Sequence, residues 1–246
     1  MAVKSIQYRH HTFNIGYEIV NPEAKYPLVF LHGWGSNKAL MKQAFGAHLD
    51  MFRHIYVDLP GFGSSTCNMA LTTDDYANIM ELFLAQINAN QDPIVVGHSF
   101  GGKVALLLNP RILVLIGSAG IKTAKSLKVR AKIALFKLLK VFGLTSLRKF
   151  FVAEDAKELS EPMYQTFKNV VDEDFAERFG MYTGRALLCW GREDTATPLS
   201  SAYRLRSLIG TSRLVEFDGD HYFFLTQAEA VAKEIETSVL KSVEHS

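Results

Sequence analysis

Short apolar runs alternate with helical patterns along the first half of the chain, and this alternation limits the possible folds more than any other feature. Four apolar runs are bounded by turn residues and are typical of buried strands, at 28–31, 54–58, 93–96 and 112–116. The stretches between them have helical patterns, at 37–49, from 74 onwards and at 103–108. Strands that alternate with helices of this length predict βαβ units. We therefore expect an α/β protein with a mostly parallel sheet flanked by helices.

The alternation stops after residue 120 and resumes at residue 186. The intervening stretch of about 65 residues has helical patterns and offers no good strand candidate. Strand patterns then return at 186–190 and 213–217, with a helix near 199–209 and a final helix from 226. These patterns predict a core built from residues 1–120 and 186–246. Residues 121–185 would form an inserted all-helical cap over one edge of the site.

Composition places the chain among ordinary globular proteins. Its 246 residues suit one domain, or one domain with a large insertion, and its net charge of +2 does not indicate a nucleic-acid partner. No stretch approaches the roughly 20 apolar residues that a membrane-spanning helix needs. The two cysteines, Cys67 and Cys189, suit a reducing compartment better than a disulfide framework. We therefore expect a cytoplasmic protein, and nothing in the sequence determines its oligomeric state.

The segment Gly97-His98-Ser99-Phe100-Gly101 is the sharpest chemical signal in the chain. It follows an apolar, β-branched strand pattern and opens a helical one, which is the setting of a nucleophile elbow. Glycines are needed on both sides because the serine lies in a strained turn. A glycine-rich turn with an incidental serine is the alternative, and the rest of the pattern disfavours it. Ser99 is therefore the candidate nucleophile.

An alcohol is a weak nucleophile at neutral pH, so it needs a base, and the base needs an orienting acid. On a fold of this kind the acid and then the histidine follow the serine in chain order. Asp194 and His221 supply that order, and each comes just after a predicted strand. Asp218, Asp220 and Glu193 are rival acids, but Asp220 is adjacent to the histidine and badly placed to meet its ring nitrogen. The predicted catalytic residues are Ser99, Asp194 and His221.

A tetrahedral intermediate also needs two preorganised donors for its oxyanion. The backbone N–H of Phe100 is one candidate, because it follows the nucleophile at a helix N-terminus. The backbone N–H of Trp34 is the other, in the loop His32-Gly33-Trp34-Gly35 after the first predicted strand. Taken alone, this loop also fits a simple glycine turn.

These motifs together resemble the α/β-hydrolase superfamily over essentially the full chain. The matching segments are 32–35, 58–63, 97–102, 191–194 with Pro198, and 219–221. Within the superfamily the chain most resembles small capped carboxylesterases and meta-cleavage-product (C–C bond) hydrolases, and it is similar to epsilonproteobacterial members. The resemblance implies a hydrolase with a helical cap that uses no cofactor and no metal.

Two positions separate the subfamilies. The C–C hydrolases usually have Asn before the nucleophile and Trp after the histidine, whereas this chain has His98 and Tyr222. These departures favour a carboxylesterase that cleaves small-molecule esters with short to medium acyl chains through an acyl-enzyme. A C–C bond hydrolase of the 2-hydroxy-6-oxo-dienoate type remains the first alternative. A non-catalytic binding module is the second, and the intact triad argues against it.

The predicted cap begins with a strongly basic segment. Residues 121–149 include nine Lys or Arg and no Asp or Glu. A solvated amphipathic cap helix explains this pattern most simply. The sharper alternatives are a docking face for an anionic substrate or acyl carrier, and a membrane-surface contact. An ester linked to a carrier would resemble the substrates of the capped pimeloyl-carrier methyl esterases.

Overall fold

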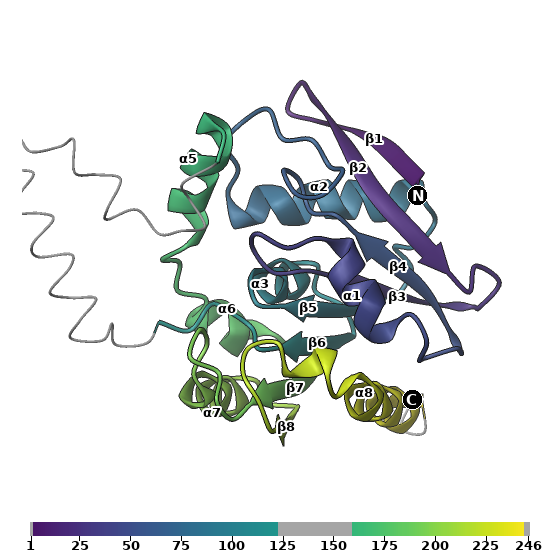
Figure 1. Ribbon diagram of the computed structural model, residues 1–246, viewed down its shortest axis with the longest axis vertical. Helices are drawn as coiled ribbons and strands as arrows, with labels where there is room; N and C mark the ends of the chain where they lie inside the picture. The colour runs from purple at the N-terminus through teal and green to yellow at the C-terminus, as the bar shows by residue number, and fades with distance from the viewer. Residues whose placement is uncertain (1, 123–158, 244–246) are drawn as a thin grey trace, which may run out of the picture.

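The computed structural model describes residues 2–122 and 159–243, which form an eight-stranded sheet with helices on both faces (Figure 1). The strands are β1 Ala2–Tyr8, β2 His11–Val20, β3 Tyr26–Leu31, β4 Phe52–Val57, β5 Ile94–His98, β6 Ile112–Ile116, β7 Arg185–Gly191 and β8 Ser212–Phe217. The α-helices are α1 Lys38–Phe45, α2 Thr73–Gln86, α3 Phe100–Leu107, α5 Glu161–Val170, α6 Ala176–Met181, α7 Leu199–Leu208 and α8 Ala228–Val243.

The strands lie in the order β1-β2-β4-β3-β5-β6-β7-β8. Strands β3 to β8 pair in parallel, whereas β1 with β2 and β2 with β4 pair antiparallel. The predicted α/β fold with a mostly parallel sheet is therefore confirmed. Because the carboxyl ends of parallel strands meet at one edge, the loops that follow β3, β5, β7 and β8 are gathered there.

Alternate residues of each central strand enter one of two apolar layers. In β3, Val29 and Leu31 join the layer that α2, α3 and α7 cover, while Leu28 and Phe30 join the layer beneath α1 and α8. All four of these side chains are fully buried. A strand buried on both faces has no polar position to alternate with, and this explains its continuous apolar sequence.

Helix α1 is shorter than the pattern over residues 37–49 predicts. The side chain of Asn37 caps its start by accepting a hydrogen bond from the backbone N–H of Ala39 at 2.9 Å. The helix ends at Phe45, and Leu49 takes a φ of 64° as the chain turns into β4. A left-handed residue cannot continue an α-helix, so the last predicted turn is lost.

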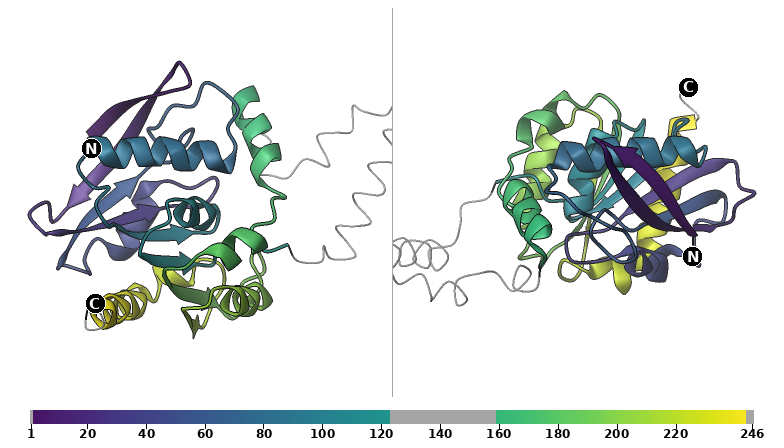
Figure 2. Two further views of the ribbon diagram at one scale, coloured as in Figure 1. Left: turned by 180° about the vertical axis from the view of Figure 1, so that it is seen from behind. Right: turned by 90° about the horizontal axis from the view of Figure 1, so that it is seen from above.

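The longest segment between consecutive strands connects two neighbouring strands, β6 and β7. These strands pair in parallel from Ile112 with Arg185 to Ile116 with Cys189. Of the predicted cap, residues 123–158 lie outside the described part of the chain. The described remainder holds α5 and α6, and its last residue, Arg185, is already the first residue of β7. In both views of Figure 2, α5 lies beside one end of α2 and α6 lies beside α7.

Candidate active site

Ser99 lies between the end of β5 and the start of α3, in a backbone conformation that few non-glycine residues adopt. Its φ is 50° and its ψ is −115°, and its N–H donates to the carbonyl of Ile116 at 3.1 Å. A Cβ at Gly97 would lie 2.4 Å from the carbonyl oxygen of Gly101, and one at Gly101 would lie 2.4 Å from that of Leu31. The chain can turn this sharply only with glycine at both positions, which leaves the serine in a strained elbow.

His221 and Asp194 are in direct contact at the same edge of the sheet. His221 Nδ1 lies 2.7 Å from Asp194 Oδ2, and the histidine side chain is 12% exposed while the carboxyl side chain is fully buried. Burial raises the pKa of Asp194, but hydrogen bonds from His221 and Thr197 outweigh it and hold that pKa below its usual value. An ionised Asp194 keeps the histidine proton on Nδ1, which leaves the lone pair of Nε2 available to a proton donor.

The rival acids are engaged elsewhere. Asp218 pairs with Arg192 at 2.5 Å, and the Oδ1 atom of Asp220 accepts the backbone N–H of Tyr222 at 2.8 Å. Glu193 is exposed to solvent. Among the four candidate acids, Asp194 is therefore the one whose carboxylate contacts the ring of His221.

The ring of His98 lies against that of His221, immediately before Ser99. The two ring centroids are 4.6 Å apart, and His98 Nε2 donates to the backbone carbonyl of His221 at 3.2 Å. Burial lowers the pKa of His98 to about 3, so its ring is neutral. Its Nδ1 atom is buried without a hydrogen-bond partner among the described residues. Position 98 differs from the Asn usual in C–C hydrolases, but the sequence did not predict the contact between His98 and His221.

The loop after β3 runs against the elbow. A Cβ at Gly33 would lie 3.1 Å from the Cβ of Ser99. The carbonyl of Gly33 accepts from Ser36 N at 3.2 Å and from His32 Nδ1 at 2.7 Å. Because the two polar groups of a trans peptide point in opposite directions, the N–H of Trp34 points away from these donors. Phe100 begins α3, and the first N–H groups of a helix have no intrahelical acceptor.

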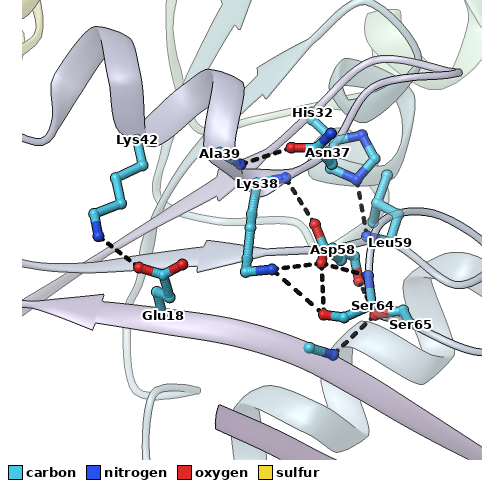
Figure 3. Close-up of polar contacts among 11 residues, drawn as sticks. Glu18, His32, Asn37, Lys38, Ala39, Lys42, Asp58, Leu59, Ser64 and Ser65 are labelled. Carbon is cyan, nitrogen blue, oxygen red and sulfur yellow. Dashed lines mark hydrogen bonds and ion pairs between the residues drawn. The ribbon is translucent and has the colours of Figure 1, made fainter. Parts of the chain in front are cut away.

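The tautomer of His32 follows from its partners. Its Nε2 atom accepts the backbone N–H of Leu59 at 3.0 Å, so the proton is on Nδ1 and donates to Gly33. Burial lowers the pKa of His32 to about 4, so the ring stays neutral at physiological pH. His32 thereby joins the loop after β3 to the loop after β4 (Figure 3).

Asp58, the first residue of the loop after β4, holds that loop through a buried ion pair. Its carboxylate accepts from Lys38 Nζ at 2.7 Å, and from the backbone N–H groups of Lys38 and Ser64 at 2.8 Å each (Figure 3). Burial alone would raise the pKa of Asp58, but these hydrogen bonds hold it below its usual value. The ion pair therefore joins the start of α1 to the loop that supports His32.

Three aromatic rings pack against the ring of Trp34. Its ring centroid lies 4.9 Å from that of Phe62, 5.6 Å from that of Phe100 and 5.4 Å from that of Phe167. Phe167 belongs to α5, so this helix reaches the loop after β3.

A cavity of about 490 Å³ opens at the edge of the sheet where β7 ends, and its lining includes Thr197 and Pro198.

Lys103 joins α3 to the segment that follows α5, a contact that sequence reasoning missed. The lysine is buried, and its Nζ donates to Glu173 Oε2 at 2.8 Å and to the carbonyl of Val170 at 2.5 Å. Desolvation lowers the pKa of Lys103, and the bond to Glu173 opposes that shift. Thr73, at the start of α2, also donates to Glu173. No sequence signal relates residues so far apart in the chain.

The parallel sheet and its glycine-flanked elbow define the class of α/β hydrolases. The model of the Alpha/beta hydrolase family matches residues 28–234, and the chain belongs to that family. None of the helices in the described ranges has the length and apolar character that crossing a bilayer requires.

Known proteins similar to this chain include esterases. A pimeloyl-[acyl-carrier protein] methyl ester esterase of Vibrio cholerae is 28% identical over 240 residues, which cover 85% of this chain and 92% of that protein. A thermophilic esterase from Thermogutta terrifontis has a TM-score of 0.74 at 17% identity, covering 98% of this chain and 99% of that one. A meta-cleavage product hydrolase from Pseudomonas fluorescens IP01 has a TM-score of 0.73 at 21% identity, covering 97% and 98%. At these identities the two structures show the shared fold.

Proposed function

We propose that the protein is a serine carboxylesterase that hydrolyses small-molecule esters with short to medium acyl chains. The observation that carries this proposal is the 2.7 Å contact between His221 Nδ1 and Asp194 Oδ2, at the edge where Ser99 lies in its strained turn. Acyl transfer requires a nucleophile, a base and an orienting acid, and the three candidates lie at one edge of the sheet.

In the proposed mechanism, Ser99 Oγ attacks the ester carbonyl while His221 Nε2 takes the serine proton. Asp194 orients the ring and stabilises the imidazolium. The backbone N–H groups of Trp34 and Phe100 bind the oxyanion of the tetrahedral intermediate. The intermediate collapses, the alcohol leaves with the proton from His221, and the acyl group stays on the serine. Water, deprotonated by His221, then releases the acid and restores Ser99.

The surroundings of Trp34 support an apolar acyl group. Phe62, Phe100 and Phe167 supply apolar surface beside the proposed oxyanion loop. We further propose that residues 121–185 form a cap, since α5 already packs on the core. Its Thr166 Oγ1 accepts the backbone N–H of Leu71 at 2.9 Å. The cap would select the alcohol and acyl groups that reach the serine.

A panel of p-nitrophenyl esters of increasing acyl length tests the proposal, with Ser99→Ala as the key variant. We expect the wild-type protein to prefer short to medium chains and Ser99→Ala to lose at least about a thousandfold in kcat. Ser200→Ala, at an exposed position in α7, serves as the matched control and should behave like the wild type. A fluorophosphonate should label the wild type once and leave the Ser99→Ala variant unlabelled. Ester cleavage that survives in Ser99→Ala would exclude the proposed nucleophile.

An ester linked to an acyl carrier is the second candidate substrate. The relative from Vibrio cholerae carries this activity in its name, and residues 121–149 hold nine basic and no acidic side chains. A methyl ester on an acyl carrier protein should then be cleaved faster than the free methyl ester, and the difference should shrink as salt rises. A preference that does not respond to salt would exclude electrostatic docking.

A C–C bond hydrolase is the remaining alternative, and the same panel discriminates it. His98 and Tyr222 favour the ester, and a coloured ring-fission product should therefore turn over more slowly than the best ester. Faster turnover of the ring-fission product would reverse this assignment.

We also propose a cytoplasmic location. Cys67 and Cys189 are both free thiols, as a reducing compartment would leave them. Cell fractionation of the tagged full-length chain tests this location.

A further inference from the structure

Thr197 lies in the loop after β7, between the proposed acid and the proposed base. Its Oγ1 atom is 2.8 Å from Asp194 Oδ2, 3.0 Å from the carbonyl oxygen of Gly117 and 3.4 Å from His221 Nδ1. The first two atoms are acceptors, and a hydroxyl has one proton to donate. The carboxylate is the closer acceptor and carries the charge, so the proton goes to Asp194.

The backbone of Thr197 is held as firmly as its side chain. The indole N–H of the fully buried Trp190 donates to the carbonyl of Thr197 at 2.7 Å. The N–H of Thr197 donates to Asp194 Oδ1 at 2.8 Å. Every polar atom of this threonine therefore has a partner, and the partners are Trp190 of β7 and both carboxylate oxygens of Asp194.

The carboxylate of Asp194 is thus held at both oxygens. Oδ1 accepts the backbone N–H groups of Ala196 and Thr197 at 2.8 Å each. Oδ2 accepts the hydroxyl of Thr197 and the Nδ1–H of His221. The two backbone N–H groups contact only Oδ1, whereas the hydroxyl of Thr197 contacts Oδ2, the oxygen that faces the histidine.

We propose that Thr197 is a positioning residue: its hydroxyl holds Asp194 Oδ2 at the Nδ1–H of His221 and so keeps the base aligned. This inference rests on the proposed function, because it assigns Thr197 a task in the same reaction. Valine would fill the volume of threonine and keep both backbone hydrogen bonds, so a role in packing alone would not need the hydroxyl.

Thr197→Val removes the hydroxyl at nearly constant volume. We expect kcat on the best p-nitrophenyl ester to fall about 10-fold with little change in KM, the effect of losing one hydrogen bond to a charged group. Without the hydroxyl the carboxylate is no longer held at the Nδ1–H of His221, so it stabilises the imidazolium less strongly. The acidic limb of the kcat/KM profile should therefore move to lower pH. Thr197→Ser restores the hydroxyl and should return both quantities to near the wild-type values.

The matched control is Thr195→Val, an exposed position in the same loop, which should leave kcat and the pH profile unchanged. A readout independent of turnover is the far-downfield proton resonance of His221 Nδ1–H, assigned by its loss in His221→Asn. It should shift in Thr197→Val and return in Thr197→Ser. If the valine variant does not fold, Thr197→Ala gives the same comparison without a branched side chain.

The inference would be overturned if the Thr197→Val enzyme is active and neither its acidic limb nor its His221 Nδ1–H resonance moves. Failure of the proposed function would look different. Ester cleavage would then be absent from the wild type or would survive in Ser99→Ala, and the role assigned to Thr197 would fall with it.

Discussion

The buried ion pair between Lys38 and Asp58 makes a sharp prediction about stability. The two side chains are 6% and 0% exposed, and Lys38 Nζ lies 2.7 Å from Asp58 Oδ2 (Figure 3). Lys38→Met keeps the length and apolar stem of the side chain and removes its charge. The variant therefore leaves a buried carboxylate without its cation.

The size of the effect follows from the donors that remain. Removing one partner of a buried ion pair costs about 3–5 kcal/mol. Asp58 keeps the backbone N–H of residue 38 and the N–H and hydroxyl of Ser64, so we expect the lower end, about 3 kcal/mol. For a chain of this size each kcal/mol lowers Tm by about 2–4 °C, which gives a decrease of about 6–12 °C at pH 7.

The pH dependence has a definite sign. The pKa of Asp58 is lowered in the folded state, so the carboxylate stabilises the fold above its unfolded pKa of about 4. That stabilisation is lost as the pH falls through the folded-state pKa. Because Lys38→Met removes a hydrogen bond that lowers this pKa, the difference in Tm between wild type and variant should shrink below about pH 4.

Thermal unfolding followed by circular dichroism at pH 7 and at about pH 3.5 measures both effects. The matched control is Lys42→Met on the same helix, where the partner is the half-exposed Glu18. Its loss should change the free energy of unfolding by less than about 1 kcal/mol. A Lys38→Met variant as stable as Lys42→Met, or a difference that widens in acid, would refute the reasoning.

Variants at three further positions test other parts of the site. Gly101→Ala should lose about 3 kcal/mol of stability in urea, because its Cβ would lie 2.4 Å from a backbone oxygen; wild-type stability would contradict this. His98→Leu should lower kcat about 10-fold and His98→Gln less, since glutamine keeps a donor for the carbonyl of His221. The pKa of His98 is about 3, so neither variant should remove a limb of the pH profile between pH 5 and 9; equal losses would argue against the hydrogen bond. Lys103→Met removes the ion-pair partner of Glu173 and should accelerate amide exchange around that residue, measured by mass spectrometry; unchanged exchange would show that the pair does not hold the segment.

The sequence predicted the fold class because its strongest signals are local. The central strands, such as 112–116, are continuous apolar runs closed by turn residues, and the glycines at 97 and 101 mark the sharpest turn. Chain order and placement after strands led to Asp194 and His221, which the structure brings into contact. The catalytic roles of these residues and the cap at 121–185 stay predictions.

The elements that sequence reasoning missed lack a local signal. Strands β1 and β2 form a hairpin, but its turn is made by Arg9 and His10 at φ 46° and 66°. Glycine or asparagine usually marks such a turn, so the hairpin was not predicted. Lys103 contacts residues far away in the chain, and the contact of Thr197 with Asp194 depends on the conformation of the loop between them. No pattern of apolar positions encodes contacts of either kind.

The pairing of β6 with β7 has a consequence for how such a chain changes over time. About 70 residues separate the two strands, and yet their register is continuous across the sheet. The entropic cost of closing a loop grows only with the logarithm of its length, so doubling or halving this segment changes the cost by about 0.6 kcal/mol. Loop closure by itself therefore penalises insertions and deletions in this segment very little. A change in the length of this segment is thus compatible with an unchanged elbow at Ser99 and an unchanged contact between Asp194 and His221.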